Sequence, residues 1–269
     1  MSASPECLKS CGESQRLRTG SPARCCTAQW VGFHLSPVHP QLIQFGRLVL
    51  PTYGFLVALG VVLALVVCVR IARLLSLDTE KIWSVALSAI VTTLVGRVLL
   101  HLLRLPGYTL SAGLAGAAAA GVYAVRLGLP VRRTADAFAP SLALGSAVVS
   151  IACLEAGCDY GTPTSVPWAV IFRSPAAVPG VPLGVPLHPT QLYAGLVEFA
   201  LFVLLLWLLH RPHYDGEILG AWLFLGGLAR FLLTSFRGDE VAGTQVSGAA
   251  MVLVGGLLWL HRPQVLHGG

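Results

Sequence analysis

The hydrophobic pattern of this chain consists of long, nearly uninterrupted apolar stretches that are separated by polar connections. Seven such stretches cover residues 48–69, 82–103, 105–125, 137–154, 190–209, 218–236 and 241–260. A helix of about 20 apolar residues is long enough to cross the hydrocarbon core of a bilayer. The pattern therefore predicts an all-α, polytopic membrane protein with seven transmembrane helices.

The cations in the connections predict the orientation of these helices. Lys and Arg concentrate in the first, third and fifth connections and after the last stretch, at Arg70, Arg73, Lys81, Arg126, Arg132, Arg133, Arg211 and Arg262. Cytoplasmic loops of membrane proteins carry an excess of Lys and Arg. We therefore expect the chain to enter its first helix from outside and to end in the cytoplasm.

Composition supports a membrane protein and excludes a water-soluble enzyme. Hydrophobic residues make up 55% of the 269 residues and charged residues only 11%, whereas soluble domains carry about 25% charged residues. The net charge of +6 is scattered between the apolar stretches. This distribution indicates membrane topology and predicts no nucleic-acid partner.

Two segments differ from the repeating apolar pattern. Residues 1–37 are polar and include four Cys, so we interpret them as a poorly ordered tail or as sequence upstream of a later translation start. Residues 38–269 are expected to form one membrane domain. The connection 158–187 holds six Pro, which excludes a helix there. Its residues 168–172 are expected to form a short strand, on the outer face, where the connection can cover a site.

Ionisable side chains within the apolar stretches are candidate site residues, because they are costly in a membrane and usually functional. Arg97 and His101 lie four residues apart and share a helix face. Arg230 and Arg237 are predicted to lie on one face of the sixth helix, with Thr234 between them. Paired guanidinium groups suit the phosphate of a lipid headgroup.

A structural role is the alternative for these arginines. Their side chains can reach up to the lipid headgroups, or they can pair with Glu198 or Glu155. In that case they serve membrane insertion and not lipid binding.

The fifth helix is predicted to start at a polar motif that suits anion binding. His188 precedes Pro189, which is expected at the first helical position, and the free N–H groups of a helix start attract anions. Gln191, Gly195 and Glu198 continue the same face as His188. The alternative is a polar helix start with the imidazole in the headgroup zone.

The cysteines predict no metal site, because their spacings lack histidines at the distances typical of zinc sites. Cys153 and Cys158 allow either a disulfide or two small buried residues. We favour two small buried residues.

Several motifs together resemble the prolipoprotein diacylglyceryl transferase family of bacteria, from about Val38 to the last helix. They are residues 186–193 (PLHPTQLY), 227–239 (GLARFLLTSFRGD), Tyr53-Gly54, Gly96-Arg97, 136–140 with Gly145, and 157–161 (GCDYG). The family has seven spans with the N-terminus outside. Members of this family reside in the bacterial cytoplasmic (inner) membrane.

The resemblance implies a reaction and its site. The family transfers a diacylglyceryl group from phosphatidylglycerol to the lipobox cysteine thiol of a preprolipoprotein signal peptide, without metal or other cofactor. Its membrane lipid and its acceptor protein are therefore the expected partners. The matching positions make His188, Tyr53 and Arg230 candidate catalytic residues. Candidate substrate-binding residues are Arg237, Gln191, Tyr193, Arg97 and Cys158.

The sequence also departs from the family motifs. Ser150 stands where the family has an essential Arg, and Ser111 stands where it has a His. Thr234 replaces a Glu, and the arm between the second and third helices is shortened to residues 105–110. Two functions therefore remain: an active or altered transferase, and a non-catalytic paralogue that keeps the lipid-binding fold.

Overall fold

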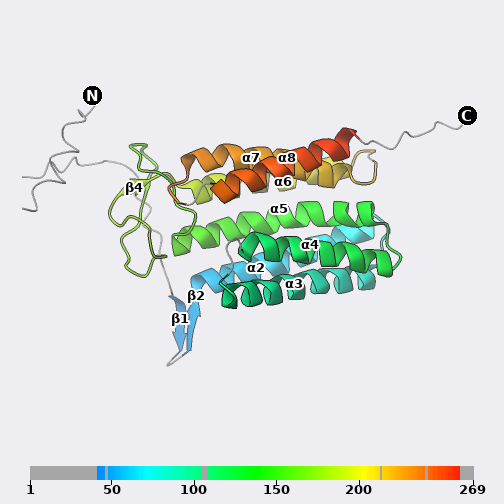
Figure 1. Ribbon diagram of the computed structural model, residues 1–269, viewed down its shortest axis with the longest axis horizontal. Coiled ribbons are helices and arrows are strands. Elements are labelled where there is room, and N and C mark those ends of the chain that lie inside the picture. Colours follow the sequence, from blue (N-terminus) through cyan, green and yellow to red (C-terminus); the bar gives the residue numbers. More distant parts are fainter. Residues whose placement is uncertain (1–40, 46–47, 105–107, 213, 240–241, 261–269) are drawn as a thin grey trace, which may run out of the picture. The chain divides into compact units, whose positions relative to one another are not determined.

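The computed structural model describes residues 41–45, 48–104, 108–212, 214–239 and 242–260, and these residues are mostly helical (Figure 1). The predicted tail, residues 1–37, lies outside them. The long helices are α2 (Thr52–Leu74), α3 (Thr79–Leu102), α4 (Tyr108–Arg126), α5 (Val131–Ala156), α6 (Thr190–Leu209), α7 (Glu217–Leu233) and α8 (Ala242–Leu260). The 3-10 turn η2 (Thr234–Phe236) follows α7. Two antiparallel pairs join β1 (Gln41–Phe45) to β2 (Leu48–Pro51) and β3 (Val170–Ile171) to β4 (Pro186–Leu187).

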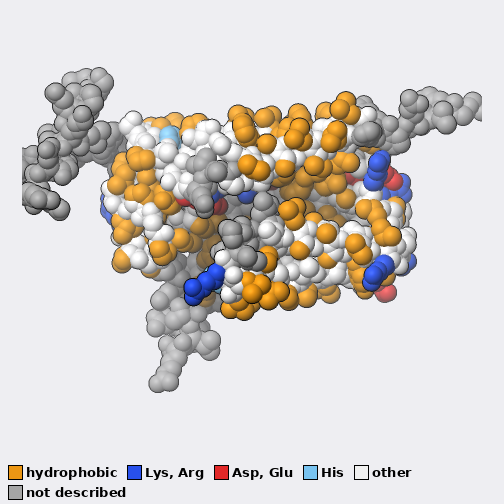
Figure 2. Space-filling model, viewed as in Figure 1, with side chains coloured by type: hydrophobic (Ala, Val, Ile, Leu, Met, Phe, Trp, Pro, Cys, Tyr) orange, Lys and Arg blue, Asp and Glu red, His pale blue; other side chains and the backbone are white. Residues whose placement is uncertain are grey.

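Six of the described helices are long and apolar enough to cross a membrane. They are α2, α3, α5, α6, α7 with η2, and α8. Helix α4 occupies the position of the third predicted span but is not among the six. Figure 2 shows hydrophobic side chains spread over the helices, with Lys, Arg, Asp and Glu mostly near the ends of the bundle. The helical, multi-pass membrane fold expected from the pattern is therefore supported, with six spans by length and composition.

The first helix begins at Thr52 and not at residue 48 as the apolar run suggested. Residues 48–51 form β2, which pairs with β1 in an antiparallel hairpin. Pro51 is the N-cap of α2 with an extended backbone (φ −71°, ψ 133°). The residue before a proline also avoids the helical region. The apolar residues before Pro51 therefore continue as a strand, and the helix starts immediately after it.

Helix α5 is the centre of the bundle. It contacts α2 on one side and α6 and α7 on the other, while α3 packs mainly against α4 and α7 against α8 (Figure 1). At one end of the bundle, α2 and α6 begin and α5 and α7 finish. We call this end the loop end. The long connection between α5 and α6 lies there.

Glycines allow the helices to approach each other closely. A Cβ atom on Gly227 of α7 would lie 2.7 Å from the Cβ of Met251, and one on Gly255 of α8 would lie 2.5 Å from the backbone N of Phe224. Gly60 of α2 and Gly145 of α5 meet in a similar way. Small residues at such interfaces are typical of membrane helices, whose association depends on close packing.

A buried carboxylate fixes the opposite end of the bundle. Asp136 on α5 is 1% exposed and accepts hydrogen bonds from the backbone N–H of Gly216 (2.6 Å) and of Leu219 (2.9 Å). Gly216 is the N-cap of α7 and Leu219 lies in its first turn, where the N–H groups have no partner within the helix. Asp136 therefore caps α7 from a neighbouring helix.

The connection between α5 and α6 packs as a small, non-helical unit at the loop end. Every residue of 157–189 is described, and none lies in a helix, as its prolines predicted. The strand expected at residues 168–172 is shorter in the structure: only Val170 and Ile171 form β3, which pairs with β4. Phe172, Val170 and Leu187 of this connection are almost fully buried and form its own small hydrophobic core.

Candidate functional site

The candidate site lies at the loop end, where three separate segments meet. Residues 158–162 follow α5, residues 186–193 lead into α6, and residues 236–239 follow α7. Backbone hydrogen bonds join them: Thr162 N–H donates to Phe236 O (2.8 Å), Gly238 N–H to Tyr160 O (2.9 Å) and His188 N–H to Thr162 O (3.0 Å). Three of the motifs singled out in the sequence are thus brought together.

His188 is held by aromatic side chains. Its Nδ1 lies 3.3 Å from Tyr193 Oη, and its ring packs edge-on against Phe236 at 5.4 Å. Tyr193 Oη in turn accepts a hydrogen bond of 2.8 Å from Trp168 Nε1. With Nδ1 facing Tyr193, Nε2 is the nitrogen left for a substrate.

Helix α6 begins at Thr190, where the fifth apolar stretch begins. Pro189, which was expected at the first helical position, is instead the N-cap of α6. The Thr190 hydroxyl donates to the Asp159 carbonyl at 2.5 Å. The helix start is therefore bonded directly to the segment that follows α5.

Gln191 is the most deeply buried of the candidate residues, at 2% exposure. Its Nε2 donates to the Cys158 carbonyl at 2.6 Å. Its Oε1 is also buried and has no hydrogen-bond partner in the part of the chain that the structure describes. A buried acceptor without a partner is costly, so Gln191 presents one unused acceptor at the site.

Cys153 and Cys158 are free thiols on either side of the end of α5. The Cys158 thiol donates to the Cys153 carbonyl at 3.7 Å. The neighbouring Cys153 thiol lowers the pKa of the Cys158 thiol below its usual value, against the opposing effect of burial. Cys153 is buried, as expected for a small core residue, whereas Cys158 is only half-buried.

Arg237 does not extend a cationic face of α7. The helix ends at Leu233, η2 follows, and Arg237 has an extended backbone. Its Nε donates to Asp239 Oδ1 at 2.8 Å, while Nη2 donates to Asp239 Oδ2 and to Asp159 Oδ1, each at 2.7 Å. Burial opposes the charge, but these carboxylates outweigh it and raise the pKa of Arg237 above its usual value.

Arg230 lies apart from this ion-pair cluster. It is exposed on the last turn of α7, and its guanidinium makes no hydrogen bond or ion pair with any described residue. It lies within electrostatic range of Glu198 on α6, whose Oε2 accepts a hydrogen bond from Trp222 Nε1 at 3.5 Å. The predicted single face carrying Arg230 and Arg237 is therefore wrong, because the chain leaves the helix between them.

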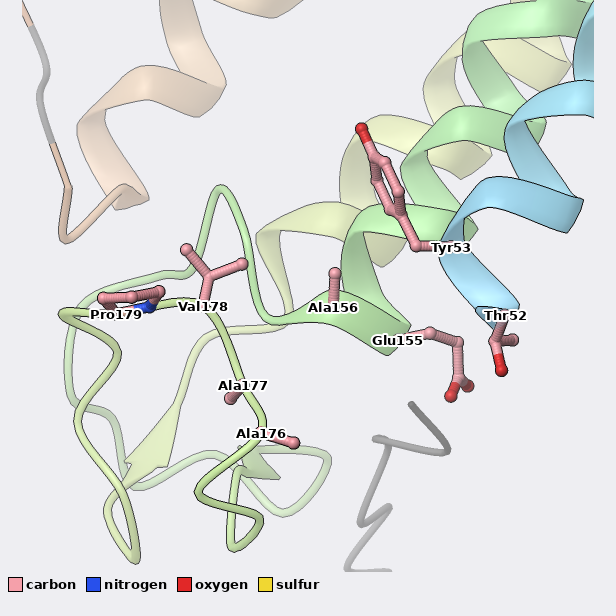
Figure 3. Close-up of a pocket in the computed structure, with 8 residues that line it drawn as sticks. All are labelled: Thr52, Tyr53, Glu155, Ala156, Ala176, Ala177, Val178 and Pro179. Carbon is pink, nitrogen blue, oxygen red and sulfur yellow. The ribbon is translucent and has the colours of Figure 1, made fainter. Parts of the chain in front are cut away.

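Tyr53 lies beside a pocket of about 300 Å³ at the loop end (Figure 3). The pocket is lined by Thr52, Tyr53, Glu155, Ala156, Ala176, Ala177, Val178 and Pro179. Tyr53 comes from the start of α2 and Glu155 from the end of α5. Tyr53 is also within electrostatic range of Cys158, Asp159 and Arg97. Arg97 and His101 are exposed on α3.

Ser150 and Ser111 stand at the two positions where the family motifs have an Arg and a His. Ser150 Oγ donates to the Ser146 carbonyl of its own helix at 3.0 Å. Its Cβ would lie 3.4 Å from a Cβ placed on Gly195, so α5 and α6 are close at this point. Ser111 is exposed on α4.

The comparison with known proteins assigns the chain to a family. The family model for prolipoprotein diacylglyceryl transferase matches residues 40–261. The chain belongs to this family. Proteins named phosphatidylglycerol–prolipoprotein diacylglyceryl transferase are similar over most of their length. That of Geobacter sulfurreducens is 32% identical over 227 residues, which cover 76% of this chain and 83% of the relative. That of Finegoldia magna is 26% identical, covering 80% and 92%.

Family membership supports the resemblance drawn from the motifs, but the structure adds residues that the motifs did not single out. Trp168 completes the chain of bonds to His188, and Asp159 and Asp239 neutralise Arg237. Both acids lie inside the quoted motifs. Their pairing was not predictable from spacing, since Asp159 and Arg237 are 78 residues apart.

Proposed function

We propose that this protein transfers a diacylglyceryl group from phosphatidylglycerol to the thiol of an acceptor cysteine in a prolipoprotein. The family match over residues 40–261 carries the proposal. In this reaction the cysteine sulfur forms a bond to the lipid glycerol carbon. The bond from that carbon to the phosphate oxygen breaks, glycerol phosphate leaves, and a base takes the thiol proton.

His188 is the residue best placed to accept that proton. A cysteine thiol has a pKa of about 8.5 and must lose its proton to attack. Tyr193 and Phe236 hold the imidazole in place, and a neutral imidazole is a suitable base near neutral pH. Trp168 and Tyr193 then act as positioning residues behind it.

The lipid headgroup is proposed to bind between Gln191, Tyr53 and Arg230. The unpaired Oε1 of Gln191 accepts a hydrogen bond from a hydroxyl of the headgroup glycerol. Arg230 has its full set of donors for a phosphate. Arg237 has already used three of its five N–H groups on carboxylates, so its main task is to hold the segment after α7 against Asp159. Arg97 and Cys158 border the same region and are proposed to contact the lipid.

The orientation of the protein follows from its cations. We propose seven spans with α4 as the third, the loop end outside, and the C-terminus in the cytoplasm of a bacterium, whose inner membrane holds the protein. The helix ends and connections opposite the loop end carry Arg70, Arg73, Lys81, Arg126 and Arg211, which supports a cytoplasmic position by the positive-inside rule. Residues 38–269 are proposed to carry the activity.

A non-catalytic lipid-binding protein is the second candidate, and Ser150 favours it. The hydroxyl of Ser150 is bonded within its own helix, so no guanidinium is present where the family motif places one. Such a protein would keep the headgroup site and lose the transfer step.

Complementation separates the two candidates. A bacterial strain depleted of its own transferase is supplied with this protein, and the mass of a reporter lipoprotein is measured. A gain of one diacylglyceryl group on the reporter cysteine supports the transferase. An unmodified reporter, together with phosphatidylglycerol binding by the purified protein, supports the lipid-binding protein.

A further inference from the structure

Two free thiols meet at the end of α5, and the backbone geometry of the helix terminus brings them together. Gly157 adopts a left-handed conformation (φ 84°), and the N–H groups of Gly157 and Cys158 both donate to the Cys153 carbonyl, at 2.8 and 3.1 Å. The bond from Cys158 closes the six-residue ring of a Schellman helix end. In this motif the side chains at the two positions that Cys153 and Cys158 occupy frequently contact each other.

The Cys158 thiol lies next to Cys153: it donates a hydrogen bond to the Cys153 carbonyl at 3.7 Å, and the Cys153 thiol is the group that most lowers the pKa of Cys158. Cys153 is 8% exposed, whereas Cys158 is more accessible. This arrangement gives one reachable thiol with a second thiol immediately behind it.

We propose that Cys153 and Cys158 form a reversible disulfide and are a modification site for disulfide-bearing oxidants. The Cys158 thiolate attacks an oxidant R–S–S–R, forms a mixed disulfide and releases one R–SH. The Cys153 thiol then displaces the second R–SH, leaving a Cys153–Cys158 bond and two reduced R–SH molecules. The pair loses two protons and two electrons, and the oxidant takes them up. The lowered pKa of Cys158 favours the first step.

The disulfide would change the candidate site through its backbone. The Cys158 carbonyl accepts the hydrogen bond from Gln191, and the next residue, Asp159, holds both Thr190 and Arg237. Pulling the Cys158 side chain onto Cys153 breaks its 3.7 Å contact and moves this segment. We therefore infer that oxidation weakens phosphatidylglycerol binding. This second inference rests on the proposed function, whereas the disulfide itself does not.

The disulfide is tested on the full-length protein in detergent. The protein is treated with oxidised glutathione, blocked with N-ethylmaleimide and digested with trypsin, and the peptide 134–173, which holds both cysteines, is weighed. We expect a peptide lighter by two hydrogens and without maleimide, which gains two maleimides after reduction. Cys68→Ser, which removes a buried thiol of α2, should behave like the unchanged protein. In Cys153→Ser, Cys158 should carry one glutathione instead.

Two maleimides on the oxidised wild-type peptide would overturn the disulfide, as would a Cys158 that gains no glutathione in Cys153→Ser.

Binding to phosphatidylglycerol vesicles is the second readout. We expect binding about tenfold weaker after oxidation, consistent with the loss of one buried hydrogen bond, and recovery after reduction. The binding of Cys158→Ser should not respond to the oxidant. Equal binding before and after oxidation would overturn the link to the site. Absent binding in the reduced protein would contradict the proposed function and leave the disulfide standing.

Discussion

Arg230 is the candidate residue whose chemistry can be tested most directly, because its guanidinium makes no hydrogen bond or ion pair with any described side chain. If it holds the lipid phosphate, Arg230→Ala should weaken phosphatidylglycerol binding by about 30- to 1000-fold, or about 2–4 kcal/mol. Arg230→Lys should recover only part of this, since an ammonium group cannot make the bidentate contact. Binding of the purified variants to lipid vesicles provides the measurement.

The control for this prediction is Arg70→Ala, which removes an exposed arginine from the last turns of α2, away from the loop end. It should leave binding unchanged. If Arg230 only reaches up to the headgroups, Lys will serve as well as Arg and the alanine variant will mainly lower expression. Near wild-type binding by both variants would remove Arg230 from the site.

Cys158 allows a test of the local electrostatics. Because the Cys153 thiol lowers the pKa of Cys158, the Cys158 thiolate forms at a lower pH than that of an ordinary cysteine. The rate of Cys158 alkylation should therefore reach half its maximum at a lower pH than in Cys153→Ala, where the donor is absent. Quantifying the 134–173 peptide by mass spectrometry after timed alkylation gives both profiles. Identical profiles would show that the thiols do not interact.

Helix α7 depends on a carboxylate from another helix. Asp136→Ala leaves the N–H groups of Gly216 and Leu219 without their buried acceptor, and we expect a loss of about 1–3 kcal/mol in unfolding free energy. The matched change is Asp215→Ala. It breaks an exposed ion pair with Arg133, so it should cost about 0–1 kcal/mol. Thermal unfolding in detergent compares the two variants, and equal losses would contradict the capping role.

The contact between α7 and α8 can be tested with two glycines of the same helix. Gly255→Ala places a Cβ 2.5 Å from the Phe224 backbone, and overpacking of this kind costs about 1–3 kcal/mol. Gly243→Ala meets no atom within 4 Å. It should leave stability unchanged or raise it by up to about 1 kcal/mol, because alanine favours helix. A melting temperature lowered by Gly243→Ala and not by Gly255→Ala would contradict the packing described.

Most of the helices were predictable because a membrane span must be long and apolar, and the chain has few other ways to arrange such residues. The predicted limits of the fifth stretch agree with α6, and those of the last stretch agree with α8 to within one residue. The strand β2 was not predictable in the same way, because the apolar residues 48–50 suit either element and the difference depends on pairing with β1. The site was harder still. The motifs named His188, Gln191 and Cys158, but only the fold shows that Asp159 and Asp239 form ion pairs with Arg237.

For the whole molecule, the proposed orientation makes opposite predictions for the two ends of the bundle. A reporter enzyme fused after Leu209, at the end of α6, should be active in the cytoplasm, and one inserted in the connection 158–187 should be active outside. The reason is that Arg70, Arg73, Lys81, Arg126 and Arg211 lie at the end opposite the loop end, and an excess of Lys and Arg marks the cytoplasmic side. The reverse pattern would exclude the proposed topology, and fusions after Arg126 provide a second cytoplasmic point.

Helices α5 and α7 run in the same direction and are fastened together at both ends. Asp136 bonds the start of α5 to the start of α7, and the segments after the two helices are joined through Tyr160, Thr162, Phe236 and Gly238. Two helices that are joined by hydrogen bonds at both ends can neither slide past each other nor separate without breaking the bonds at one end. Any rearrangement that makes room for a substrate therefore falls to the helices outside this pair.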